Sequence, residues 1–423
     1  VAVAAVGVNR RKGRQRRKAD DAQRLPHDQL KRRAEEHQRS AGRCKQIAPD
    51  QLTRRLAQKR PVARRLKHHT DHQHGRVLAA AVNLDFLACV ALNGTSVVHF
   101  QSEGWPMTSV DLADLEVKEE EKETTASLIR GVLAKLHKAG YPVAGFDMYV
   151  TSTVLPGSGL SSSAACEVLI GTTGNHLFCQ DKFDAVEIAK IGQAAENEYF
   201  GKPCGLMDQT ASSVGDAVAI DFKDPANPIV RSINADLTGL GLALCIIDCG
   251  ADHAALTNEY ASIPEEMCKV AAHFGKKVLR EVKEEDLLAD LAQVRKEAGD
   301  RAVLRALHFY ADDRRAAEEA DALERKDKEA FLNLVKESGR SSWELLQNIT
   351  PAAAITHQDM AVALAVAEKA LNGKGACRVH GGGFAGTIQA FVPVEDVCEF
   401  KKTMETMLSE GCCHVLRDRK SVV

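Results

Sequence analysis

The sequence lacks a long apolar run. No uninterrupted stretch reaches the roughly 18 apolar residues that a membrane-spanning helix needs, so we expect no membrane span. The apolar start over residues 1–8 is too short for one. Basic residues follow this start instead of preceding it, which is the reverse of a secretory signal.

The spacing of a zinc site and that of a disulfide framework are missing as well. The 12 cysteines are scattered, and neither the pair Cys245 and Cys249 nor the pair Cys412 and Cys413 has the second half of a zinc pattern. Disulfide frameworks are typical of short secreted chains. We therefore expect reduced, mostly buried thiols in a cytoplasmic protein.

Aromatic residues are absent before Phe86, and this absence marks an unusual N-terminal segment. Residues 1–70 contain 21 Lys and Arg against 6 Asp and Glu, whereas the rest of the chain contains 35 against 52. Residues 1–67 also have too few large apolar side chains to offset the entropy cost of folding. We predict that residues 1–68 form an atypical basic segment that is non-native or disordered.

Three interpretations of this segment are open. A nucleic-acid-binding arm would carry such charge, and so would an organellar transit peptide, although transit peptides are usually Ser-rich and this segment has only Ser40. The third is a reading-frame artefact or gene-prediction error, because out-of-frame translation of a GC-rich gene yields an Arg-rich, aromatic-free composition. We favour the third interpretation and expect no nucleic-acid partner.

From residue 76 onward the chain has an α/β pattern, and its length of 423 residues favours two domains with a boundary within residues 234–241. Apolar alternation predicts strands over 76–91 and 96–101, joined through Asn93-Gly94 as a hairpin. A helix is predicted over 125–139, ended by Gly140. Its apolar face would carry Ile129, Val132, Leu133 and Leu136. Further strands are predicted over 146–152, 217–222, 242–248, 378–380 and 386–392, and helices over 162–178, 185–199 and much of 264–370.

A glycine- and serine-rich turn, Pro156-Gly-Ser-Gly-Leu-Ser-Ser-Ser-Ala164, joins a predicted strand to a predicted helix. It brings backbone N–H groups and hydroxyls to a helix N-terminus, where about half a positive charge attracts anions. The turn is not a P-loop, because Leu160 follows Gly159 where a Lys is needed, and Ser162 breaks the dinucleotide fingerprint. Taken alone, it indicates either a phosphate site or an ordinary strand-to-helix turn.

Five other features carry candidate functional residues, and each has an alternative interpretation. Glu196 could be a solvated helix residue, Asp208 a helix N-cap, and Tyr260 a packing residue on a helix face. The glycine loop 381–386 could be only a tight turn. The cluster His68, His69, Asp71, His72 and His74 could hold zinc.

Together these segments resemble the motifs of the GHMP kinases, and within that superfamily they are most similar to the galactokinase family. The Pro156–Ala164 turn resembles the second family motif, Gly381–Gly386 the third, and His69-Thr-Asp71 the end of the first. The block Cys204-Gly-Leu-Met-Asp-Gln209 is typical of galactokinases. The resemblance covers roughly residues 69–423. It implies an α/β (α+β) fold with an S5-like N-terminal lobe over residues 69–235 and a ferredoxin-like C-terminal lobe over residues 236–423.

The resemblance also implies a role for each segment. Asp208 would be the catalytic residue, as base or orienting acceptor for the anomeric hydroxyl of D-galactose, which receives the γ-phosphate of ATP. Ser163 and Glu196 would hold Mg²⁺. The ATP phosphates would be bound by Gly157, Ser158, Gly159, Leu160, Ser161, Ser162, Ser163 and Ala164. Galactose would be contacted by His69, Asp71, Gly205 and Tyr260.

The sequence departs from the family upstream of His69. The family has an arginine beside the catalytic aspartate, where it favours the ionised carboxylate, but the matching position here is Val62. His68 stands where a Glu is usual. A galactose and ATP sensor without turnover, or a related sugar kinase such as an N-acetylgalactosamine kinase, is therefore the alternative. In either case we expect a monomer.

Overall fold

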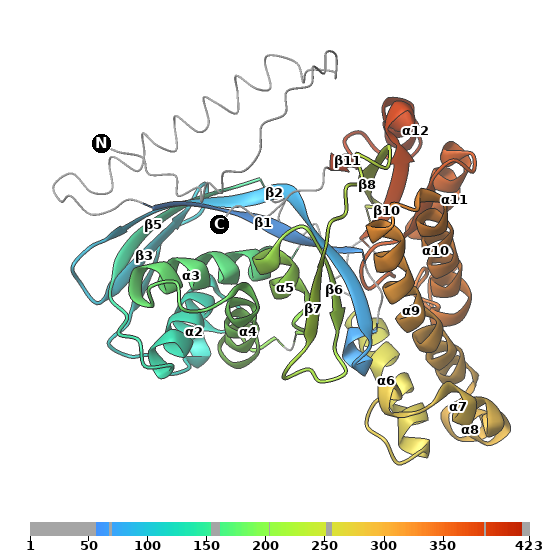
Figure 1. The fold of residues 1–423 in the computed structure, drawn as a ribbon, viewed down its shortest axis with the longest axis horizontal. Coiled ribbons are helices and arrows are strands. Elements are labelled where there is room, and N and C mark those ends of the chain that lie inside the picture. Colours follow the sequence, from blue (N-terminus) through green and yellow to red (C-terminus); the bar gives the residue numbers. More distant parts are fainter. Residues whose placement is uncertain are drawn as a thin grey trace.

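The computed structural model describes residues 56–66, 70–153, 161–202, 204–250, 256–384 and 386–416. Five predicted site residues lie outside these ranges: His69, Gly157, Ser158, Gly159 and Leu160. The described chain forms an α/β (α+β) fold with two lobes, each built around one sheet (Figure 1).

The N-terminal lobe has a seven-stranded sheet in which β1 and β5 both pair with β2. Its main path runs β4-β3-β5-β2-β6-β7, and all pairs except β3 with β5 are antiparallel. The strands are β1 (Leu56–Leu66), β2 (Arg76–Leu92), β3 (Val97–Ser102), β4 (Thr108–Asp111), β5 (Phe146–Ser152), β6 (Ala217–Asp221) and β7 (Ile229–Ile233).

Helices cover one face of this sheet (Figure 1). The apolar face predicted for the helix over residues 125–139 is confirmed. Its four residues are fully buried against the strands: Ile129, Val132, Leu133 and Leu136. The helices are α2 (Thr125–Lys138), α3 (Ser162–Phe178), α4 (Ala185–Ala195) with the π-turn η3 (Glu196–Phe200), and α5 (Met207–Val214); the 3₁₀ turns are η1 (Asp71–Gln73) and η2 (Glu119–Glu121).

The C-terminal lobe has a four-stranded antiparallel sheet in the order β11-β8-β10-β9. Numbered from the first strand of the lobe, this order is 4-1-3-2, and a helical segment follows the first and third strands, as in a ferredoxin-like fold. The strands are β8 (Leu242–Asp248), β9 (Ala376–Val379), β10 (Thr387–Pro393) and β11 (Cys413–Leu416). The helical elements are α6 (Thr257–His273), η4 (Leu279–Glu281), α7 (Glu284–Ala289), α8 (Leu291–Ala298), α9 (Asp300–Glu324), α10 (Lys328–Ser341), the π-turn η5 (Ser342–Leu346), α11 (Asp359–Leu371), η6 (Val394–Asp396) and α12 (Val397–Met407).

The predicted hairpin between residues 76–91 and 96–101 is wrong. Both strands form, but β5 lies between them and pairs with each. The Asn93 side chain donates to the Val97 carbonyl at 2.9 Å and to Asp147 Oδ1 at 2.9 Å, and so joins the turn to the inserted strand. An Asn-Gly turn marks a reversal of the chain, whereas the choice of neighbouring strand depends on the whole sheet.

Residues 56–66, which belong to the predicted atypical segment 1–68, form β1, although the sequence shows no strand pattern there. Backbone pairing with β2 needs only N–H and C=O groups. Pro61, which has no N–H to donate, lies where the register shifts between Pro61 and Val62. The non-native origin of residues 1–68 stays a prediction.

Among the described residues, ten cysteines are not part of a disulfide. Cys89 in β2 is an exception, because it takes part in a disulfide. Within the part of the chain that the structure describes, no helix is both long and apolar enough to cross a membrane.

Two arginines and two aspartates join the lobes. Arg280 in η4 contacts Asp313 of α9 at 2.6 Å and Asp221 of β6 at 2.9 Å. Arg76, the first residue of β2, contacts Asp221 at 3.1 Å and Asp313 at 3.0 Å. Around this cluster, apolar side chains of β2 and β6 pack with those of β8, α9 and α10 in one core. The lobes are therefore held by both burial and charge.

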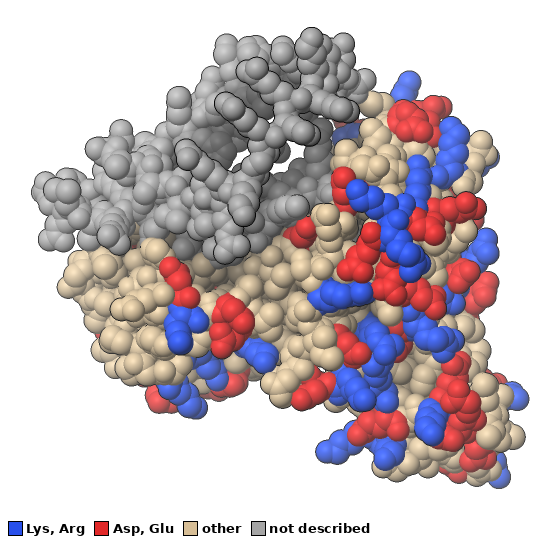
Figure 2. Space-filling model, in the orientation of Figure 1, with Lys and Arg blue, Asp and Glu red and all other residues tan. Residues whose placement is uncertain are grey.

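On the face shown in Figure 2, acidic and basic side chains are interspersed over the second lobe. One exposed pair, Arg231 of β7 with Asp321 of α9 at 2.8 Å, links the two lobes. Such pairs contribute little to stability because water screens them.

We predict that Arg280→Ala destabilises the protein by about 3 kcal/mol, because it removes one of the two cations facing the largely buried Asp221 and Asp313. The measurement is the urea concentration at the midpoint of unfolding. Arg295→Ala is the control, since Arg295 pairs with Asp300 at the surface, where water screens the pair and little change in stability is expected. Equal effects of the two substitutions would contradict the prediction.

Candidate functional site

The N-terminus of α3 carries the serines of the second motif. Ser161 precedes the helix in a left-handed conformation, with φ 54° and ψ 51°, and the 17-residue helix begins at Ser162. The hydroxyl of Ser163 donates a hydrogen bond to Glu196 Oε1 at 3.0 Å. This end of the helix thus combines a positive dipole end with a serine hydroxyl held by a carboxylate.

Glu196 lies where α4 changes into the π-turn η3. A capping box between Asp184 and Glu187 starts α4, and the Gly201 N–H bonds to the Glu196 carbonyl at the end of the turn. Only 3% of Glu196 is exposed, so it is not a solvated helix residue. A single π-turn inside an α-helix is frequent at functional sites.

Gln209 joins two buried carboxylates. Its Nε2 group donates to Glu196 Oε2 at 2.9 Å and to Glu167 Oε2 at 3.0 Å. Glu167 is completely buried, and this burial, together with the negative charge of Glu196, raises its pKa well above the usual range. The structure therefore favours a protonated Glu167 next to Glu196.

Neither Glu167 nor Gln209 is among the site residues predicted from the sequence. Glu167 follows Ser163 by four residues, so the two lie on the same face of α3. A single glutamate among the apolar residues of a buried helix was the signal that could have identified it. Gln209 follows Asp208 directly, and its separate role appears only in the side-chain contacts.

The backbone of residues 204–209 is fastened to the end of α4. Asn197 Oδ1 accepts a hydrogen bond from the Cys204 N–H at 2.7 Å, and Gln193 Nε2 donates to the Cys204 carbonyl at 3.1 Å. Asp208 is half-buried and is the second residue of α5, whose N-cap is Leu206. The N-cap interpretation of Asp208 is therefore wrong.

Asp71 lies against Gly205. A Cβ atom on Gly205 would be 3.0 Å from Asp71 Oδ2, so the carboxylate contacts the glycine backbone directly. Asp71 Oδ1 accepts a hydrogen bond from the His72 N–H at 3.0 Å. Two predicted substrate-binding residues that are far apart in the sequence thus meet in the fold.

The loop around Asp71 is held by the second lobe. Gln73 Oε1 accepts a hydrogen bond from the Leu279 N–H at 2.9 Å, and His72 Nε2 is 3.3 Å from Met267 Sδ in α6. In the described part of the chain, no group of three or more His, Cys, Asp or Glu could hold a metal ion. The zinc interpretation therefore finds no support among the described histidines.

Tyr260 packs on the glycine loop of the third motif. Its hydroxyl donates to the Gly383 carbonyl at 2.8 Å, and its ring meets Phe384 edge to face at 5.5 Å. A Cβ atom on Gly382 would lie 2.5 Å from the Tyr260 ring, so only glycine fits there. Burial raises the pKa of Tyr260 to about 12. Tyr260 thus has the packing role that the sequence left as an alternative, and its hydroxyl oxygen can still accept a hydrogen bond.

Residues 204–209 connect the two halves of this site. Gly205, at one end, contacts Asp71, and Gln209, at the other, bonds to Glu196. In the sequence, Asp208 lies between Gly205 and Gln209. A ligand hydroxyl near Asp71 and an anionic group near Ser163 would both be close to this segment, which is the arrangement a group-transfer site needs.

The site can hold a hard cation beside an anion. Ser163 Oγ and Glu196 Oε1 are oxygen donors 3.0 Å apart. Mg²⁺ in proteins usually takes one or two carboxylates, together with water and phosphate oxygens. The donor set therefore fits Mg²⁺ better than a thiolate- or imidazole-preferring metal.

Comparison with known proteins agrees with this geometry. A family model described as the GHMP kinases N terminal domain matches residues 127–216. The galactokinase of Streptomyces coelicolor is 30% identical over 337 residues, which cover 80% of this chain and 84% of that protein. The galactokinase of Glaesserella parasuis is 30% identical over 347 residues, with 79% and 84% covered.

A solved structure has the same fold. The crystal structure of Lactococcus lactis galactokinase complexed with galactose matches with a TM-score of 0.75 and 22% sequence identity, and the match covers 90% of this chain and 97% of that one. On the identity and coverage of these relatives, the chain belongs to the galactokinase family of the GHMP kinases.

Proposed function

We propose that this protein transfers the γ-phosphoryl group of ATP to the anomeric hydroxyl of D-galactose and so forms galactose 1-phosphate. Family membership supports the reaction class. The observation that carries the proposal is the segment 204–209, which contacts Asp71 at one end and Glu196 at the other. Sugar and phosphate would then meet at Asp208.

Galactose would bind at the Asp71 end of the segment. An ionised carboxylate accepts hydrogen bonds from hydroxyls. A buried carboxylate without such a partner is destabilised, so a sugar that lacks the hydroxyl binds more weakly. Asp71 is suited to this task because the His72 N–H holds its Oδ1, while its Oδ2 lies close to Gly205, where there is no side chain. His69, Gly205 and Tyr260 would complete the sugar site.

The ATP phosphates would bind at the N-terminus of α3. Ser161, Ser162, Ser163 and Ala164 begin this helix, and Gly157, Ser158, Gly159 and Leu160 precede it in the sequence. Ser163 and Glu196 would hold Mg²⁺, which when bound neutralises negative charge on the phosphates. Gln209 would keep Glu196 oriented toward Ser163 by bonding to its other oxygen.

Asp208 would act on the acceptor hydroxyl. As the anomeric oxygen forms its bond to the γ-phosphorus, the bond from that phosphorus to the bridging oxygen breaks and ADP leaves. The hydroxyl proton passes to the Asp208 carboxylate, which also orients the hydroxyl for in-line attack. Little covalent work is left to the protein, so positioning supplies most of the rate.

Val62 favours one alternative function. It stands where the resemblance places an arginine beside the catalytic aspartate, and without that cation a carboxylate is ionised less easily. A sensor that binds galactose and ATP without turnover would result if this loss abolished the reaction. We further propose a cytoplasmic monomer.

Asp208→Asn should lower kcat at least about 100-fold, since the amide cannot accept the hydroxyl proton. Galactose binding should change only a few-fold. The measurement is a coupled ADP-release assay with Mg-ATP and D-galactose, and the surface variant Asp300→Asn is the charge-matched control. Undiminished turnover would contradict the role of Asp208, whereas a wild-type protein that binds both ligands without turnover would be a sensor.

Asp71→Asn should weaken galactose binding roughly 10- to 100-fold, because a neutral amide makes weaker hydrogen bonds than a carboxylate. The amide oxygen can still accept from the His72 N–H, so the loop should stay folded. Calorimetric titration of galactose measures the effect, with ATP binding as the internal control. An unchanged galactose affinity would remove Asp71 from the sugar site.

Gln209→Leu should raise the Mg²⁺ concentration needed for half-maximal activity roughly 10-fold, since Glu196 loses the partner that orients it. The KM for galactose should change much less. The matched control is Gln293→Leu, which removes a similar amide-to-carboxylate bond, to Glu297, at the surface. If Gln209→Leu shifts the Mg²⁺ requirement and the KM for galactose equally, or lowers only the melting temperature, the role of Gln209 is merely structural.

A further inference from the structure

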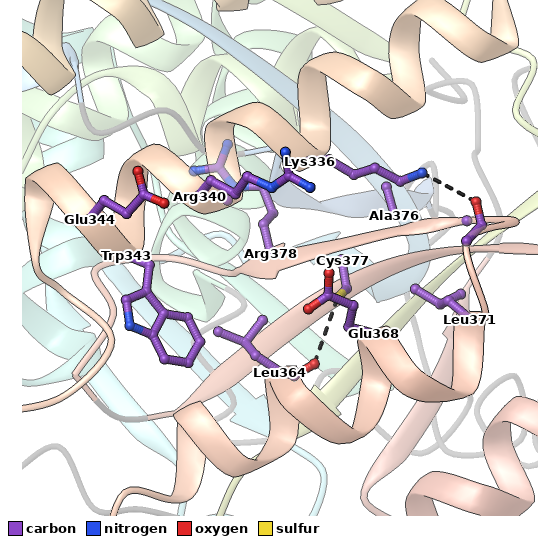
Figure 3. Close-up of a pocket in the computed structure, with 13 residues that line it drawn as sticks. Lys336, Arg340, Trp343, Glu344, Leu364, Glu368, Leu371, Ala376, Cys377 and Arg378 are labelled. Atoms are coloured by element: carbon purple, nitrogen blue, oxygen red, sulfur yellow. Dashed lines mark hydrogen bonds between the residues drawn. The ribbon is translucent and has the colours of Figure 1, made fainter.

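A cavity lies in the C-terminal lobe, between α10, η5, α11 and β9 (Figure 3). Its volume is about 610 Å³, within the range of small-molecule sites in proteins. None of the 13 residues that line it belongs to the site described above. The cavity therefore needs an explanation of its own.

Close packing under the cavity keeps its walls apart. A Cβ atom on Gly339 of α10 would lie 3.0 Å from the Arg378 Cβ atom, so the helix rests directly on β9. Arg378 is almost fully buried below this contact and donates to Ser338 Oγ at 2.5 Å. The floor of the cavity is thus closely packed.

One wall is cationic. Lys336 and Arg340 are one turn apart on the same face of α10. Lys336 Nζ donates to the Gly373 carbonyl at 3.2 Å, whereas Arg340 is exposed and has no ion pair among the described residues. Arg378 lies beneath them, where its Nη2 is 3.9 Å from the buried carboxylate of Asp312, and its Nε has no hydrogen-bond partner in the described part of the chain.

One acidic side chain faces this wall, and one acidic and one aromatic side chain lie at an end of the cavity. Figure 3 shows Glu368 on α11 across the cavity from Arg340, with Glu344 and Trp343 at one end. Neither glutamate forms an ion pair with a described cation; Glu368 lies on the helix opposite Arg340, whereas Glu344 belongs to η5, which continues α10. Trp343 is 46% exposed and offers a ring face for stacking.

We propose that this cavity binds a sugar monophosphate. Lys336 and Arg340 supply the charge-assisted hydrogen bonds that a phosphate takes. The carboxylates of Glu368 and Glu344 accept hydrogen bonds from sugar hydroxyls, and the apolar face of the ring rests on Trp343. A polyphosphate fits less well, because both carboxylates would repel its additional charge.

The cavity is connected to the third-motif loop through two of its walls. η5 leads to Asn348, whose side chain donates to the Gly382 carbonyl at 3.1 Å, and β9 leads to Gly381 directly. Galactose 1-phosphate, the product under the proposed function, belongs to the ligand class of the cavity. This choice of probe rests on that function, but the binding test needs no turnover.

The test uses intrinsic fluorescence, because the chain has only 2 tryptophans, Trp105 and Trp343. In a Trp105→Phe background, titration with galactose 1-phosphate should give a saturable change in Trp343 emission. Inorganic phosphate and free galactose should each bind at least 10-fold more weakly. Arg340→Gln should weaken the response at least 10-fold, whereas the surface control Arg325→Gln should leave it unchanged.

Asp71→Asn separates this site from the proposed active site. If the cavity binds the ligand, the Trp343 response persists in Asp71→Asn and weakens in Arg340→Gln, while turnover with galactose is retained in Arg340→Gln. A response lost in Asp71→Asn but kept in Arg340→Gln would overturn the proposal, as would the absence of any saturable change. Equal affinity for inorganic phosphate would overturn the assignment of a sugar ligand. Failure of turnover alone would leave this result unaffected.

Discussion

The cluster of Arg76 and Arg280 with Asp221 and Asp313 is the interaction on which the arrangement of the lobes depends. It joins the first residue of β2 to η4 and α9, so the loop just before β2 is fixed between the lobes. That loop contains Asp71. The position of Asp71 against Gly205 therefore follows from how the two lobes are joined.

Desolvation explains the design of the other half of the site. Placing Glu196 in the interior is costly unless its oxygens are paired. Ser163 bonds to one oxygen and Gln209 to the other, and Gln209 also bonds to Glu167, whose burial favours the neutral form. The side-chain amide of Gln209 thus orients the carboxylate of Glu196. Because burial favours the neutral form of Glu167, little further negative charge is buried beside Glu196. Gln209 belongs to the segment 204–209, which also contains Gly205. The positions of Asp71, on the proposed sugar side, and Glu196, on the proposed phosphate side, therefore both depend on this short segment.

Much of the local structure could be predicted from periodicity. The strand over residues 146–152, the helix over 162–178 and the strand over 242–248 have the bounds that the apolar pattern indicates. The pairing of strands could not be predicted in the same way. The turn at Asn93-Gly94 correctly predicted that the chain reverses there. Nevertheless β5 lies between β2 and β3, because the order of strands in a sheet depends on contacts between residues far apart in the sequence.

The sequence alone determined the family resemblance and which residues could do chemistry, because the motifs of serine, glycine and carboxylate have a fixed order along the chain. Only the tertiary structure decided which of them meet. It buried Glu196, brought Asp71 to Gly205, directed Tyr260 to the glycine loop and revealed Glu167 and Gln209 as partners. The physical reason is that side-chain pairing depends on burial and on distance in space, and neither is encoded by a local pattern.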